Sequence, residues 1–213
     1  MNIFLLSNTL NPAVHYDEQA IFHCDKHVVK MIVESTQMLV TALSSGKLPT
    51  GMRNYIPESI TGVPIAMPCK PLGTAMQKHP CTLWVCESMT NFNYLARLAW
   101  MLCLEHSYRY PLSPDHAYRK WLGELSTWLE TDFDLWLDSP LPKHFAVAIK
   151  DADKRSTHTA HREAVALYRS YYVDDKAGFA TWKRRGTPVW FLIGAEAKQA
   201  KQAKASKPDV YKF

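Results

Sequence analysis

The chain has 213 residues, of which 47% are hydrophobic and 21% are charged, and it carries a formal net charge of +5. This length suits one domain with a full core and is short for two ordinary domains. No apolar run approaches the roughly 20 residues of a membrane-spanning helix, and the start, MNIFLLS, is too short and lacks the basic residues of a signal peptide. We therefore expect a soluble, cytoplasmic protein without a membrane partner, in which the five cysteines are reduced thiols.

The beginning of the chain predicts one short strand and one long helix. Residues 2–7 alternate weakly between polar and apolar side chains, as a strand does. Residues 16–45 predict a single helix, with Asp17 as its N-cap and Gly46 just beyond its end. Apolar side chains occupy most of the remaining surface of this helix, so we expect it to lie inside the domain.

One narrow polar stripe runs along this predicted helix. At about 100° of turn per residue, the stripe contains Tyr16, His23, His27, Lys30, Glu34, Gln37 and Thr41. Burying two imidazoles, an ammonium group and a carboxylate is costly unless these groups meet partners. The stripe is therefore predicted to be either an internal polar network or the floor of a functional cleft.

The next segment, residues 47–80, contains too many prolines and glycines for a regular element, yet it is apolar enough to pack on the core. We expect it to form a lid or an elaborated wall. Further helices are predicted at about 81–107, 113–137, 156–172 and 175–184. The second of these is expected to begin at Ser113 with Pro114 in its first turn, and its aromatic stripe is interpreted as core packing.

The predicted fold class is therefore mainly α. Residues 1–193 are expected to form a single-domain irregular helical bundle with at most one short N-terminal strand and a long Pro/Gly-rich loop. Residues 194–213 are rich in alanine and lysine and predict a basic C-terminal helix or tail.

Five blocks of the sequence carry a family resemblance. They are MNIFLLS at the start, CDKHVVKMIVESTQML at 24–39, HPCTLWVCESMTNFNYL at 79–95, EHSYRY at 105–110 and YRSYYVDDKAGFATWKRRGTPVWF at 168–191. Together they resemble a family of small proteins carried by tailed bacteriophages and some large DNA viruses, in which the CDKHVVK motif is specific. The resemblance implies a helical domain and a viral context, and hence the cytoplasm of a host cell. It implies no particular reaction.

The strongest candidate for a catalytic site is the set His23, His27, Lys30 and Glu34 on the polar stripe. Two imidazoles can serve as acid and base in attack on phosphorus, while an ammonium group stabilises the developing charge. Glu34 lies one turn beyond Lys30, where it can hold the lysine or orient a histidine. This combination predicts an enzyme that cleaves a phosphate ester without a metal, such as a nuclease, phosphatase or nucleotide hydrolase.

The basic charge and the many aromatic residues suit a nucleic acid or a nucleotide as partner, because cations bind phosphate and aromatic rings stack on bases. An aromatic cluster at 168–172 adds to this pattern. The candidate substrate-binding residues are Asp25, Lys26, His79, Trp84, Asn93, Tyr94, Arg109, Arg169 and Lys176.

A metal site is one alternative for the two histidines. Their i, i+4 spacing occurs in zinc sites, and Glu34 or His79 would complete the ligand set. The glutamate of an HExxH motif is missing, since Cys24 follows His23, and Lys30 would repel the cation. We therefore expect no cofactor and keep a divalent metal, bound by His23 and His27, as the alternative.

Three other interpretations remain open. Lys30 as nucleophile and Glu34 as its assistant predict a base-modifying or glycosylase-type enzyme acting on DNA. Alternatively, the chain is a non-catalytic protein that binds nucleic acid or inhibits a host factor through basic residues such as Lys183 and Arg184. A purely structural interpretation makes Lys30 and Glu34 an ordinary helical ion pair.

Overall fold

Helices make up most of the fold in our computed structural model, which describes residues 2–44, 67–133, 139–149 and 155–205. In chain order the elements are α1 (Pro12–Phe22), α2 (Asp25–Ser44), α3 (Thr74–Gln77), α4 (Pro80–Glu87), α5 (Met89–Arg109), α6 (Arg119–Phe133), β1 (His144–Ala148), β2 (Arg155–Ala160), α7 (His161–Tyr171), η2 (Tyr172–Lys176) and α8 (Val189–Ala205). The prediction of a mainly α fold is confirmed. Four predicted features lie outside the described residues: the cap at Gly46, most of the long loop, the end of the helix predicted at 113–137, and residues 206–213 of the tail.

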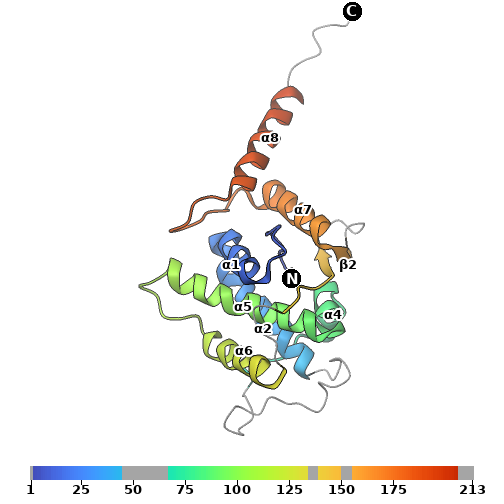
Figure 1. The fold of residues 1–213 in the computed structure, drawn as a ribbon. Coiled ribbons are helices and arrows are strands. Elements are labelled where there is room, and N and C mark those ends of the chain that lie inside the picture. The colour runs from blue at the N-terminus through green and yellow to red at the C-terminus, as the bar shows by residue number, and fades with distance from the viewer. Residues whose placement is uncertain (1, 45–66, 134–138, 150–154, 206–213) are drawn as a thin grey trace, which may run out of the picture.

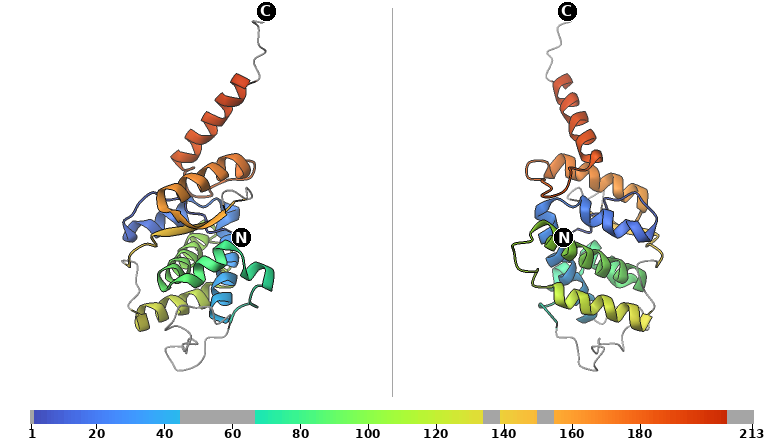
Figure 2. Two further views of the ribbon diagram at one scale, coloured as in Figure 1. Left: turned by 90° about the vertical axis from the view of Figure 1, so that its right-hand side faces the viewer. Right: turned by 60° about the vertical axis from the view of Figure 1, so that its left-hand side comes forward.

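The elements are stacked around α5. Helices α2, α4 and α5 lie together, α6 packs along α5 on one side, and α1, the small sheet and α7 lie on the other (Figures 1 and 2). Helix α8 projects away from this body in all the views, and it runs without a break across residue 194, where we had placed the start of the tail (Figure 2). None of the helices in the described ranges is long and apolar enough to cross a membrane.

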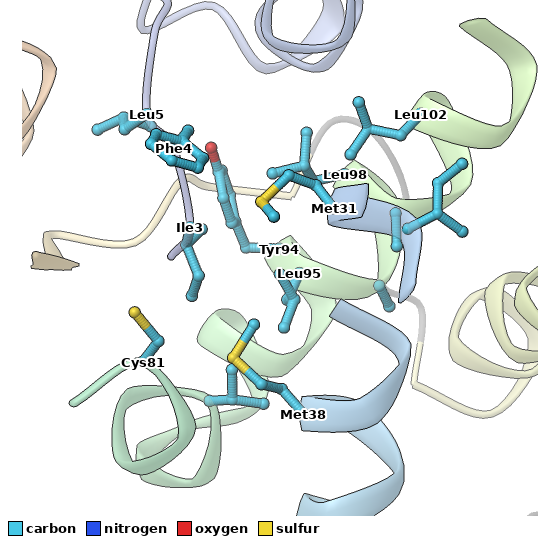
Figure 3. Close-up of a cluster of buried hydrophobic side chains, with 14 of the residues drawn as sticks. Ile3, Phe4, Leu5, Met31, Met38, Cys81, Tyr94, Leu95, Leu98 and Leu102 are labelled. Atoms are coloured by element: carbon cyan, nitrogen blue, oxygen red, sulfur yellow. The ribbon is translucent and has the colours of Figure 1, made fainter. Parts of the chain in front are cut away.

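The core forms where the N-terminal segment meets α2 and α5. Figure 3 shows Phe4 of this segment, Tyr94 of α5 and Met31 of α2 in one cluster of buried hydrophobic side chains. All three side chains are at most 3% exposed. Trp121 and Trp128 of the aromatic stripe of α6 are buried as well, at most 5% exposed, so core packing is confirmed for these two residues. The predicted stripe members Phe133 and Trp136 lie outside the described side chains.

The helix predicted at 16–45 is in fact two helices, α1 and α2, with a break at His23 and Cys24. The ψ angle of His23 is 133°, which ends α1. The N–H of Asp25 donates to the Thr181 carbonyl at 2.8 Å, and the Arg109 guanidinium donates to the Ile21 and His23 carbonyls at 2.9 Å. Partners from distant parts of the chain therefore satisfy the backbone groups that the break exposes.

The caps of these helices also differ from the prediction. Helix α1 begins five residues earlier than Asp17, because the Asn11 side chain accepts from the N–H of Ala13 and Pro12 takes the first helical position. The helix predicted at 81–107 is interrupted at Ser88, whose hydroxyl caps α5 by accepting from the N–H of Asn91 at 3.1 Å.

The helix predicted from Ser113 begins only at Arg119. The Asp115 carboxylate, which we expected near the start of that helix, instead accepts a hydrogen bond from the Ser107 hydroxyl at 2.7 Å and pairs with Arg119. The acidic group thus ties the loop to α5, and the helix starts after it.

The strand predicted at residues 2–7 does not form, and the described residues contain one antiparallel sheet elsewhere. The side chain of Gln19 accepts from the N–H of Leu6 at 2.7 Å, and Arg169 donates to the Leu6 carbonyl at 2.6 and 2.8 Å, so side chains replace a partner strand. Strand β2 takes the place of the first turns of the helix predicted at 156–172, because the ladder with β1 pairs Thr159 with Phe145. The helix predicted at 175–184 is replaced by η2, a π-helical turn that extends α7, and by turns.

Candidate functional site

A pocket of about 250 Å³ lies where the first turns of α2 face η2 and the N-terminal segment. It brings together three of the four predicted catalytic residues, His27, Lys30 and Glu34, and two of the predicted binding residues, Lys26 and Lys176. The remaining lining residues are Asn2, Phe4, Tyr171 and Phe179. The expectation that α2 is enclosed nearly all round is wrong at this point, since Lys26, Val29 and Lys30 are exposed.

Positive charge dominates the pocket. Lys30 and Glu34 form an i, i+4 ion pair with an N···O distance of 3.3 Å. The other two ammonium groups lie over aromatic rings, that of Lys26 at 4.9 Å from the Phe179 centroid and that of Lys176 at 4.3 Å from the Tyr171 centroid. Neither Lys26 nor Lys176 has a carboxylate partner among the described residues. The pocket therefore carries an excess of two cations, which suits an anionic ligand.

Contacts with Phe4 and with the buried Tyr172 hold the His27 ring in place. The His27 ring stacks on Phe4 with centroids 4.5 Å apart, and Nδ1 lies 2.5 Å from the Tyr172 hydroxyl. Burial, together with nearby groups that include Lys30 and Lys176, lowers the pKa of His27 to about 3. His27 is therefore neutral at pH 7.

The same contact determines which His27 nitrogen carries the proton. Burial raises the pKa of Tyr172 well above its usual value, so the phenol keeps its proton. An imidazole nitrogen is a stronger acceptor than the Cys24 thiol, which also lies near this hydroxyl. Tyr172 accordingly donates to Nδ1 of His27, and the His27 proton resides on Nε2. Nε2 of His27 is thus a hydrogen-bond donor and cannot act as a base.

His23 does not line this pocket, contrary to its predicted place in the catalytic set. Its side chain is completely buried, Nδ1 lies 2.5 Å from the Gln19 carbonyl, and Nε2 has no hydrogen-bond partner among the described residues. Burial lowers the pKa of His23 to about 4. Because α1 ends here, the polar stripe is interrupted, and the predicted pair of histidines acting as acid and base is not assembled in the pocket.

Asp25 and Arg109, both predicted to bind substrate, belong to a buried charge network. Arg109 Nη1 donates to Asp25 at 3.0 Å, and Nε donates to Glu105 at 2.6 Å. Arg185 adds two hydrogen bonds to Glu105, at 2.7 and 3.0 Å. Asp25 also accepts from the Thr181 hydroxyl at 2.8 Å. This network fastens α2 to α5 and to the 181–185 segment, so it positions the pocket without lining it.

Two predicted stacking residues are part of the core. Trp84 is completely buried and its indole N–H donates to the His144 carbonyl at 2.8 Å. Tyr94 is equally buried, and its hydroxyl lies 2.9 Å from His15 Nε2. Neither ring is available to a base.

Three further predicted binding residues make contacts that stabilise the fold. Asn93 is buried and accepts from Arg97 at 3.0 Å. His79 caps α4 by accepting from the Cys81 N–H at 3.2 Å. Arg169 donates to the Leu6 carbonyl and lies 5.1 Å from the Trp190 ring, beside a different groove.

Sequence reasoning missed the aromatic walls contributed by Phe4 and Phe179. They come from opposite ends of the chain, and no local spacing relates them to α2. The aromatic cluster at 168–172 was a usable signal, since Tyr171 lines the pocket and Tyr172 supports His27. Within the described ranges, no group of three or more His, Cys, Asp or Glu side chains is arranged to hold a metal ion.

The pocket thus combines three cations, a hydrogen-bond donor and aromatic walls. Such a site suits a ligand that has both negative charge and a flat ring. Comparison of the chain with protein-family models, with curated proteins and with solved structures finds no match.

Proposed function

We propose that the pocket binds a phosphate group of a nucleotide or nucleic acid and that the protein cleaves a phosphate ester there. The observation that supports this most strongly is the gathering of Lys26, Lys30 and Lys176 around a pocket that has one carboxylate among its lining residues. Two of these ammonium groups lie over aromatic faces and form no ion pair within the described part of the chain, so they can turn to a phosphate without breaking one.

His27 adds a neutral donor to this set. In the tautomer fixed by Tyr172, its Nε2–H can hydrogen bond to a phosphate oxygen, and the three lysines stabilise the charge that develops on the phosphoryl oxygens during attack. The rings of Tyr171 and Phe179 offer faces on which a base can stack.

Glu34 is the group in the pocket that can take a proton. Its carboxylate accepts the proton of a water molecule, the water oxygen forms a bond to phosphorus, and the bond from phosphorus to the ester oxygen breaks. The leaving oxygen takes a proton from solvent. Glu34 thus replaces the second histidine of the predicted mechanism as general base, while His27 serves as a donor.

The geometry gives less support to Lys30 as the nucleophile of a glycosylase. Its side chain is 63% exposed and forms an ion pair with Glu34 at 3.3 Å. A nucleophilic lysine has to lose its proton, which burial away from carboxylates promotes. The non-catalytic alternative was assigned to basic residues such as Lys183 and Arg184, which do not line this pocket. A protein that binds nucleic acid without cleaving it would need no role for Glu34.

The test is turnover of a labelled panel of single-stranded DNA, duplex DNA, RNA and nucleotides by the wild type and by Glu34→Gln. We expect wild-type cleavage that withstands a chelator, and a loss of about 10²- to 10⁴-fold in Glu34→Gln with affinity retained. The control is Glu163→Gln, an exposed glutamate of α7 outside the pocket, which should keep full activity. Full activity in Glu34→Gln, or tight binding without any turnover, would overturn the proposed reaction.

A further inference from the structure

A second pocket, of about 470 Å³, adjoins the first. Lys26 and Lys30 line both, so the two hollows meet along the exposed first turns of α2. The second pocket is completed by Asp25, Val29, Tyr110, Thr181 and Lys183. Lys183 takes no part in the proposed reaction.

The second pocket repeats the chemistry of the first. The ammonium group of Lys183 lies 5.4 Å from the centroid of the Tyr110 ring, as Lys26 and Lys176 lie over Phe179 and Tyr171. Lys183 has no carboxylate partner for its side chain among the described residues. A third cation paired with an aromatic face is thus available for another phosphate and another base.

Hydrogen-bond donors already offset the negative charge of the one carboxylate that lines the second pocket. Asp25 accepts from the Arg109 guanidinium at 3.0 Å, from the Thr181 hydroxyl at 2.8 Å and from the backbone N–H of Lys183 at 2.9 and 3.0 Å. These donors hold the carboxylate in place and offset its charge, so it presents little repulsion to an anion. The same hydrogen bonds hold the backbone of Lys183 beside the second pocket.

The row of cations continues past Lys183. Arg184 is exposed and its guanidinium carbon lies 4.8 Å from the centroid of the Tyr108 ring, which is 40% exposed. The φ angle of Arg184 is 59°, in the left-handed region that side chains other than glycine rarely adopt. Arg184 Nη1 donates to the Tyr108 carbonyl at 2.9 Å, and the Tyr108 hydroxyl donates to the Arg184 carbonyl at 3.2 Å. The surroundings therefore hold this residue in a strained conformation.

We propose that the two pockets form one continuous track for single-stranded nucleic acid. This inference rests on the proposed phosphate site of the first pocket and names its substrate class. A mononucleotide fills one pocket and leaves Lys183 and Tyr110 unused, whereas a strand of several nucleotides reaches the cations of both. Bases of a single strand can stack on the aromatic rings, while those of a duplex are already stacked on one another.

The experiment compares the full-length protein with Lys183→Gln in binding to a mononucleotide, a dinucleotide and an octanucleotide, as DNA and as RNA. We expect Lys183→Gln to leave mononucleotide affinity unchanged and to weaken the octanucleotide about tenfold, the loss of one charge-assisted contact. The slope of log K against log salt should fall by about 0.7, the value for one phosphate contact on a single strand. The control is Lys120→Gln, an exposed charge of α6 that lines neither pocket.

The outcomes separate the track from the phosphate site itself. Equal affinity of the wild type for the mononucleotide and the octanucleotide, or an octanucleotide affinity unaffected by Lys183→Gln, would overturn the track and leave the first pocket standing. Duplex binding as tight as that of the single strand, or displacement of the oligonucleotide by polyglutamate at equal charge, would overturn the assignment to single strands. Failure of the wild type to bind any member would refute the proposed function as well.

Discussion

Replacing Arg109 with methionine is expected to lower the free energy of unfolding by about 3–5 kcal/mol, the usual cost of breaking a buried ion pair. The Arg109 side chain is completely buried and donates to both Asp25 and Glu105. Methionine fills much of the volume but leaves the Asp25 carboxylate without its guanidinium and two carbonyls at the end of α1 without their donor. The measurement is chemical denaturation followed by circular dichroism.

Arg119→Met is the matched control. Like Arg109, Arg119 pairs with an aspartate, in this case Asp115. The Arg119 and Asp115 side chains, however, are 31% and 59% exposed. An exposed pair of this kind contributes about 0–1 kcal/mol, so the control should lose little stability. Equal losses in the two variants would contradict the structural role of the Arg109 network.

The double substitution Lys26→Gln, Lys176→Gln is expected to weaken binding of an oligonucleotide roughly 100-fold. Each lysine offers a charge-assisted contact to phosphate, with about a tenfold effect apiece, and the two contributions should add if the side chains act independently. Both ammonium groups rest on aromatic faces that remain in the variant, so the fold should be unaffected. Fluorescence anisotropy of a labelled oligonucleotide measures the change.

A second double variant with the same change in net charge controls for long-range attraction. Lys198→Gln, Lys201→Gln removes two lysines of α8 that line neither proposed pocket. We expect its affinity to stay within about threefold of the wild type, since distant charges are screened over roughly 10 Å in ordinary salt. A similar loss in both double variants would mean that overall charge, and not the pocket, drives binding.

Part of the site could be predicted from the sequence because it is local to one helix. Lys26, Lys30 and Glu34 repeat every four residues, so a helical period places them on one face. The predicted stripe held His27 with Lys30 and Glu34, and all of these side chains line one pocket with Lys26. The mainly α fold was equally predictable from helical periodicity.

The break at His23 was not predictable from local sequence. Neither proline nor glycine marks it, and residues 16–45 keep a helical pattern throughout. The break exists because Arg109 and Thr181, far away in the chain, satisfy the backbone groups that it exposes. This tertiary effect overrides helix propensity, and it removes His23 from the pocket.

The aromatic walls were missed for a similar reason. Phe4 and Phe179 are far apart in the sequence and meet only when the N-terminal segment packs beside η2. Trp84 and Tyr94 looked equally suitable for stacking, yet their polar atoms are engaged in the core. Residue type alone does not distinguish a buried ring from one that lines a pocket.

The most direct test of the phosphate site is the pKa of His27, measured by NMR titration of its imidazole with and without a bound oligonucleotide. Burial lowers this pKa to about 3 in the free protein, so the ring should stay neutral down to the acid limit of the folded state. A bound phosphate favours the imidazolium form. The pKa should therefore rise on binding, and affinity should increase as the pH falls between the two pKa values.

His27→Gln identifies the signal, and the Lys26→Gln, Lys176→Gln variant should show the shift only at a ligand concentration roughly 100-fold higher. A rise in the His27 pKa that saturates with ligand would support a phosphate bound against its Nε2. An unchanged His27 pKa in a protein saturated with oligonucleotide would contradict the site.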